Sequence, residues 1–155
     1  MNFQHHPDIW KRFPQLSACA VWARGIQPNM QAEAALDPLV GQARELLKQA
    51  GGSEGQLPAV QAWRRGFSEL GLKPTQYRCA AESLLRRLRQ DGNLPRVYPL
   101  VDTFNALSVA HAIPIAVFDL SRVQGRIEVR LATGTERFIS FYGEEETPEH
   151  GEVVF

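Results

Sequence analysis

The basic residues of this 155-residue chain are concentrated in one segment. Between positions 64 and 96, eight Lys or Arg residues stand against three acidic ones. Several of these arginines recur at near-multiples of the helical turn and, with Glu82, fall opposite the apolar face of a predicted helix. The arginines that could bind phosphate groups are Arg65, Arg78, Arg86 and Arg89. The alternative is a solvated helix face on which Glu82 forms ion pairs with its arginine neighbours.

Asp102 and Asn105 lie one turn apart in the largely apolar segment 99–112. Asp102 falls in the first turn of a predicted helix, where backbone N–H groups and the helix dipole stabilise a carboxylate. A structural cap is therefore the simpler explanation for Asp102. Asn105 has no such explanation, because a buried amide needs hydrogen-bond partners. It either joins two segments of the chain or faces a pocket.

The other reactive side chains form no catalytic pattern. The sequence contains no phosphate-binding glycine loop, no GxSxG, no HExxH and no paired-cysteine zinc motif. His5 and His6 lack acidic or cysteine partners for a metal, and His111 fits a capping or packing role at a helix end. Cys19 lies in an apolar stretch and is expected to be a buried, unreactive thiol. We therefore expect no metal and no other cofactor.

The composition limits the class of protein. The 17 basic side chains equal the 17 acidic ones in number, which excludes a wholly basic nucleic-acid coat but leaves room for a local patch. The length predicts a single domain over 1–155. No apolar run approaches the roughly 20 residues that span a bilayer, and the first residues do not follow a signal-peptide pattern. With two cysteines in no motif, these features predict a soluble, cytoplasmic protein without a membrane partner.

Helical periodicity dominates the part of the chain from about 27 to 112. The predicted helices cover about 31–50, 58–70, 77–90 and 99–112. Glycine and proline residues mark their ends. The stretch GGSEGQLP between the first two helices is predicted to be a flexible connector.

Strand patterns precede and follow the helices. An apolar run over 16–26 predicts a buried strand, and Pro28 and Asn29 mark the turn after it. The strand-rich part, about 113–155, contains IAVFDL, RIEVRLA and RFISFY. The fold class is therefore α+β, with the helical part packed on a sheet. The terminal GEVVF is typical of the start of a strand, so we expect a domain truncated at its C-terminus, with a native terminal strand as the alternative.

Several segments in the same order resemble one known family. The stretch LPRVYPLVDTFNALSVAHAIPIAVFDL, followed by VQGRIEVRLATGTERF, resembles the B3/B4 domain of the bacterial phenylalanyl-tRNA synthetase beta subunit. The shorter segments VWARGI, AWRRGF and KPTQYR are similar to those of freestanding proteins built around this domain. The resemblance implies an α+β fold in which helices pack on an unusual β-sandwich. In the synthetase, this domain hydrolyses tyrosine wrongly esterified to the phenylalanine tRNA.

Only part of the family's editing site transfers to this chain. The resemblance places the family's editing-site asparagine at Asn105, which makes Asn105 the candidate catalytic residue. It places Ala116 where the family has a histidine, so one hydrogen-bonding group is missing. The family's acidic residue and glycine-rich segment would follow Phe155. The ATP-binding motifs of a synthetase are absent, which excludes aminoacylation.

The resemblance implies tRNA or aminoacyl-tRNA as the partner and leaves three functions open. The first is trans-editing, in which Asn105 positions water or substrate while Arg65, Arg86 and Arg89 hold phosphate; Arg78 and Asp102 are further binding candidates. Such hydrolysis needs no covalent nucleophile, because the aminoacyl ester is already activated. The second is a non-catalytic RNA-binding module. The third is a pocket for an amino-acid-like small molecule. The sequence does not indicate an oligomeric state.

Overall fold

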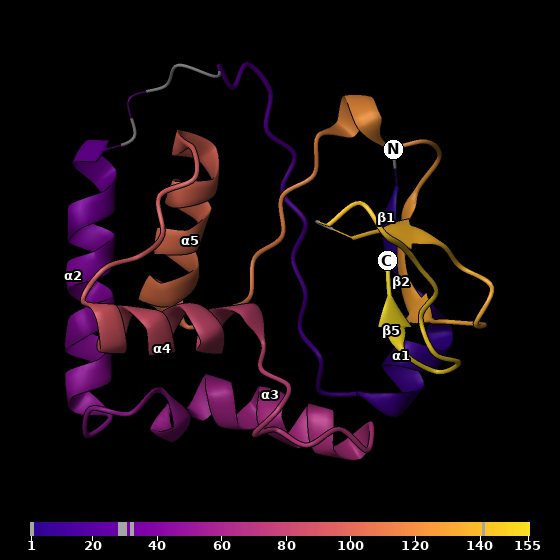
Figure 1. Ribbon diagram of the computed structural model, residues 1–155, viewed down its shortest axis with the longest axis horizontal. Coiled ribbons are helices and arrows are strands. Elements are labelled where there is room, and N and C mark those ends of the chain that lie inside the picture. The colour runs from indigo at the N-terminus through magenta and orange to yellow at the C-terminus, as the bar shows by residue number, and fades with distance from the viewer. Residues whose placement is uncertain (1, 28–30, 32, 141) are drawn as a thin grey trace. The chain divides into compact units, whose positions relative to one another are not determined.

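The computed structural model describes residues 2–27, 31, 33–140 and 142–155, which form two compact units (Figure 1). The first, here called the helical unit, is Ala23–Val117. The second, the strand unit, combines Met1–Trp22 with Phe118–Phe155. Helices and small sheets occur together, which confirms the α+β class. The packing of helices on a β-sandwich-like sheet stays a prediction.

The helical unit contains the four helices that the periodicity predicts. They are α2 (Glu33–Gln49), α3 (Pro58–Glu69), α4 (Ala80–Asp91) and α5 (Pro99–His111). A short 3-10 helix, η1 (Glu54–Gln56), lies between α2 and α3. The connector GGSEGQLP is therefore partly helical rather than wholly irregular.

Local sequence signals fix the helix ends. Pro58 and Pro99 occupy first-turn positions of α3 and α5, where the missing N–H costs nothing. Cys79 caps α4 by accepting a hydrogen bond from the Glu82 backbone N–H to its Sγ at 3.5 Å. Gly92 ends α4 in the left-handed conformation at φ 74°, which glycine adopts without steric strain.

The core of the helical unit forms where α2 packs beside α5 and is crossed by α4 (Figure 1). Its buried side chains come from all four helices and the turns that flank them. They are Ala43, Leu47, Leu57, Val60, Leu85, Leu88, Val109 and Ala112. Leu85 and Leu88 are one turn apart, so both lie on the same face of α4, and this face packs into the core. Because the apolar face of α4 is buried in the core, its arginines lie on the remaining face.

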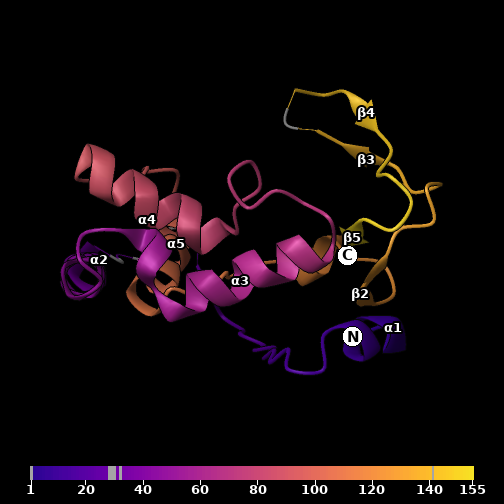
Figure 2. The same cartoon turned by 90° about the horizontal axis from the view of Figure 1, so that it is seen from below.

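The strand unit is built around β2 (Ile127–Leu131), which the alternation in RIEVRLA predicts. A parallel strand, β1 (Phe3–His5), pairs with one edge of β2, and an antiparallel strand, β5 (Val153–Val154), pairs with the other. The helix α1 (Pro7–Arg12) packs against β2. Neither β1 nor α1 is predicted from the sequence. Figure 2 shows the separate antiparallel pair of β3 (Phe138–Ile139) and β4 (Glu145–Glu146).

Two strand predictions are wrong. Residues 16–26 form no strand, and neither does IAVFDL (residues 115–120). The last residue of IAVFDL begins the 3-10 helix η2 (Leu120–Arg122), and the residues before it are irregular. Many of the apolar side chains in both segments are exposed, for example Val21 by 85% and Val117 by 43%. Cys19, expected to be buried, is exposed as well. Apolar composition alone cannot predict a strand, because a strand also needs a partner edge. The predicted turn residues Pro28 and Asn29 lie outside the described residues.

The burial of Leu85 gives a test of this core. Leu85 is fully buried in the centre of the cluster. We expect Leu85→Ala to lower the free energy of unfolding of the helical unit by about 2–5 kcal/mol, because it removes packed methyl groups and leaves a cavity. Urea denaturation followed by helical circular dichroism measures the change. Arg87→Ala, at an exposed position of the same helix, should stay within about 0.5 kcal/mol of the wild type.

Candidate functional site

Four arginines of the helical unit gather around two buried glutamates. Glu54 of η1 is 4% exposed and Glu82 of α4 is 0% exposed. We call these six residues the arginine–carboxylate cluster: Glu54, Glu82, Arg64, Arg78, Arg86 and Arg89. Four guanidinium groups against two carboxylates leave the cluster with a net charge of about +2 when all six are ionised.

Glu54 holds two arginines from consecutive turns of α4. Arg89 donates from Nε to Oε2 at 2.7 Å and from Nη2 to Oε1 at 3.4 Å, and Arg86 Nη1 lies 3.7 Å from Oε1. Burial by itself raises the pKa of the Glu54 carboxyl, but the hydrogen bond from Arg89 and the charges of both arginines outweigh it and lower that pKa. Glu54 is therefore ionised at neutral pH.

Glu82 holds an arginine from α3 and one from the segment before α4. Arg64 donates to Oε1 from Nε at 3.2 Å and from Nη2 at 2.6 Å, and Arg78 Nε lies 3.6 Å from the same oxygen. The hydrogen bond to Glu82 raises the pKa of Arg64. The second oxygen, Oε2, is buried and has no hydrogen-bond partner among the described residues. Burial also raises the pKa of the neighbouring Cys79 thiol, which stays protonated.

Gly55 lets the Arg64 guanidinium approach the chain closely. A Cβ atom at position 55 would lie 3.0 Å from both Nη1 and Nη2 of Arg64. That distance is shorter than ordinary van der Waals contact. The absence of a side chain at Gly55 therefore helps to place Arg64 over Glu82.

The cluster changes the sequence-based interpretation of α4. Arg86 and Arg89 lie on α4 and share Glu54, as their spacing predicts, whereas Arg78 precedes the first residue of the helix. Glu82 pairs with Arg78, as the alternative interpretation predicts. Its placement on a solvated face is wrong, because Glu82 is fully buried and α3 supplies Arg64 to cover it. Glu54 was missed altogether. A single acidic residue in a glycine-rich connector gives no periodic signal.

Arg65 lies apart from the ion pairs. It is exposed and has no ionic partner among the described residues. It lines a cavity of about 380 Å³ together with Arg64, Ser68, Glu69 and Pro74. Of the predicted arginines, Arg65 is thus the one that pairs with neither buried carboxylate.

Asp102 lies in the first turn of α5 and connects the helix to the chain before it. Its Oδ1 accepts a hydrogen bond from the Val97 backbone N–H at 2.8 Å, and its Oδ2 lies 3.8 Å from Arg96 Nη1. Asn105, one turn further along α5, is partly buried. No hydrogen bond joins its side chain to another residue that the structure describes.

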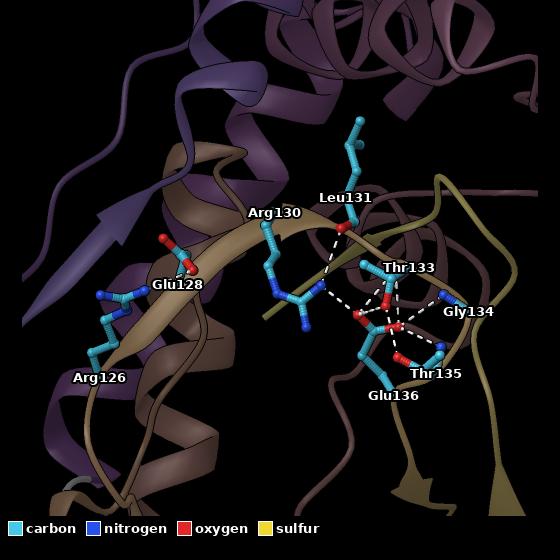
Figure 3. Close-up of polar contacts among 8 residues, drawn as sticks. All are labelled: Arg126, Glu128, Arg130, Leu131, Thr133, Gly134, Thr135 and Glu136. Carbon is cyan, nitrogen blue, oxygen red and sulfur yellow. Dashed lines mark hydrogen bonds and ion pairs between the residues drawn. The ribbon is translucent and has the colours of Figure 1, made fainter.

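The strand unit contains a second polar centre, which the sequence analysis missed. The carboxylate of Glu136 accepts hydrogen bonds from the backbone N–H groups of Thr133, Gly134 and Thr135 at 3.0–3.2 Å, and Arg130 donates to it as well (Figure 3). These bonds, the backbone ones foremost, hold the pKa of Glu136 far below its ordinary value. Arg130, Glu136 and Phe138 line part of a cavity of about 430 Å³.

Two of the histidines, His5 and His6, make structural contacts. His6 caps α1, because its Nδ1 accepts a hydrogen bond from the Asp8 N–H at 3.3 Å. His5 contacts the rings of Phe3 and Trp10, and His111 is exposed at the end of α5. Within the described ranges, no group of three or more His, Cys, Asp or Glu side chains is placed to hold a metal ion. No helix found in those ranges is long and apolar enough to cross a bilayer.

Glu136 provides a test of electrostatic stability. Because its pKa is lowered on folding, its contribution is complete above the unfolded pKa of about 4.5 and is lost as the pH falls below that value. We expect Glu136→Gln to reduce the free energy of unfolding at pH 7, and the difference from the wild type to shrink below pH 4.5. Urea denaturation across this range measures both. Glu144→Gln, at an exposed position of the same unit, is the control and should change neither quantity.

Comparison with known sequences gives one family. The sequence pattern of the B3/4 domain matches residues 62–155, which is more than half of the chain. This match confirms the resemblance to the B3/B4 domain of the synthetase beta subunit. It includes every candidate site residue from the sequence analysis, whereas Glu54 precedes it. Neither a curated protein nor a solved structure matches the chain.

Proposed function

The chain belongs to the B3/4 domain family, and from this premise we propose that it binds tRNA or aminoacyl-tRNA through the arginine–carboxylate cluster and Arg65. The observation that carries this proposal is the gathering of four partly exposed guanidinium groups in a chain with no net charge. Guanidinium forks bind phosphate oxygens in pairs, which suits an RNA backbone. We place this function in the cytoplasm, where tRNA is charged.

We also propose that both units serve one domain over residues 1–155. The family match supports this, because it runs from α3 in the helical unit to β5 in the strand unit.

Hydrolysis of a mischarged ester is the second candidate function. It is favoured by Asn105, a partly buried amide with no side-chain partner among the described residues, at the position that the resemblance links to editing. In this role the Asn105 amide would orient a water or the ester carbonyl. The alanine at position 116 favours binding without turnover.

Arg65 gives the cleanest test of tRNA binding. We expect Arg65→Glu to weaken tRNA binding several-fold and to reduce the slope of log affinity against log salt by about one, because it removes one phosphate contact. Fluorescence titration with tRNA at 50–200 mM salt measures both. Lys48→Glu on α2 makes the same change in net charge at a residue outside the cluster and should have a much smaller effect. Wild-type affinity that does not vary with salt would contradict phosphate binding.

Asn105 tests the hydrolytic candidate. With tRNA carrying tyrosine, phenylalanine or other amino acids, we expect ester release above the buffer rate for at least one pair. Asn105→Ala should slow that release by about 10²-fold, the usual effect of removing one transition-state hydrogen bond. Asn93→Ala, at an exposed turn, should leave the rate unchanged. If no pair is hydrolysed faster than in buffer, the protein only binds its ligand.

A further inference from the structure

We propose that Glu54 and Glu82 are positioning residues: their buried carboxylates fix the guanidinium groups of Arg64, Arg78, Arg86 and Arg89 for contact with RNA phosphates. This inference rests on the proposed function and deepens it. It assigns a role in binding to two residues whose charge repels the ligand.

The burial pattern separates the two kinds of charge. The side chains of Glu54 and Glu82 are 5% and 0% exposed, whereas those of the four arginines are 30–42% exposed. An approaching phosphate therefore meets guanidinium groups first, and the carboxylates stay behind them. Because two carboxylates neutralise only half of the four cations, the outer surface of the cluster keeps its positive charge.

The hydrogen bonds leave part of each guanidinium group unused. Arg89 and Arg64 donate to their glutamates from Nε and Nη2, so Nη1 takes no part in these bonds. Arg78 approaches Glu82 through Nε at 3.6 Å. A guanidinium carries five N–H donors, and those not bound to a carboxylate remain for a second acceptor. An arginine held at one edge also loses less side-chain entropy when it binds phosphate.

Stability alone does not account for this arrangement. Buried ion pairs often contribute no more than apolar side chains of the same size, because desolvation offsets their attraction. Glu82 carries an additional cost, since its Oε2 is buried without a hydrogen-bond partner in the described part of the chain. A role in positioning Arg64 and Arg78 explains why a glutamate occupies this buried position.

The direction in which one substitution changes tRNA affinity distinguishes a positioning role from a purely electrostatic one. Glu54→Gln removes a negative charge close to the bound phosphates. If Glu54 acts only through its charge, this change strengthens tRNA binding or leaves it unaltered. If Glu54 positions Arg86 and Arg89, the same change weakens binding although the protein becomes more positive.

The experiment compares tRNA affinity and its salt dependence for the full chain and its variants. We expect Glu54→Gln to lower the affinity roughly tenfold and to reduce the salt slope by about one to two, because two phosphate contacts are no longer held together. Glu82→Gln should act in the same direction through Arg64 and Arg78. The melting temperature of each variant shows whether it is folded.

Asp91→Asn provides the matched control. Asp91 pairs with Arg87 on the same helix at 3.5 Å, but both side chains are mostly exposed, by 60% and 57%. Removing this carboxylate should leave tRNA affinity unchanged or slightly higher. Glu54→Asp keeps the negative charge but moves the carboxylate, because its side chain is shorter and cannot reach both arginines. This variant should also weaken tRNA binding.

The outcomes are distinct. A folded Glu54→Gln variant that binds tRNA as tightly as the wild type, or more tightly, overturns the positioning role and leaves the proposed function standing. Loss of the fold in both Glu54 variants assigns Glu54 to stability and also overturns it. Wild-type protein that shows no salt-dependent tRNA binding removes the proposed function and the inference together.

Discussion

The pairing of buried carboxylates with half-exposed guanidinium groups is the constraint on which the helical unit depends. Glu54 and Glu82 cannot lie inside the protein unless cations accompany them, because an unpaired buried charge is strongly destabilising. Satisfying them draws α3, α4 and η1 to one place. The apolar core and this polar cluster occupy different faces of α4, so one helix serves both packing and charge organisation.

The strand unit solves a similar problem by another route. There, Glu136 is satisfied mainly by backbone N–H groups of the turn that follows β2, with Arg130 as its only cationic partner in the described part of the chain (Figure 3). A carboxylate bound in this way fixes the conformation of a loop and leaves no excess positive charge beside it. The contrast explains why the helical unit is the better candidate for contact with a polyanion.

The sequence predicts the local features of this protein better than its long-range ones. The helices α2 to α5 and the strand β2 follow from periodicity, because their signals lie within one segment. The pairing of β1 with β2 joins residues 3–5 to residues 127–129, and no local pattern reports such a contact. Arg78, Arg86 and Arg89 could be identified from their spacing, because they lie within one segment. Arg64, Glu54 and the burial of Glu82 depended on neighbours that only the fold brings close.

The contact between Gly55 and Arg64 has a consequence for related sequences. A side chain at position 55 would put its Cβ 3.0 Å from both terminal nitrogens of Arg64, so the guanidinium group that bonds to Glu82 would have to shift. Glycine at this position should therefore covary with the arginine–glutamate pair: homologues that keep both partners should keep the glycine, and those that lose one should tolerate a side chain there. A three-residue signature of this kind would distinguish chains that share the cluster from those that share only the fold.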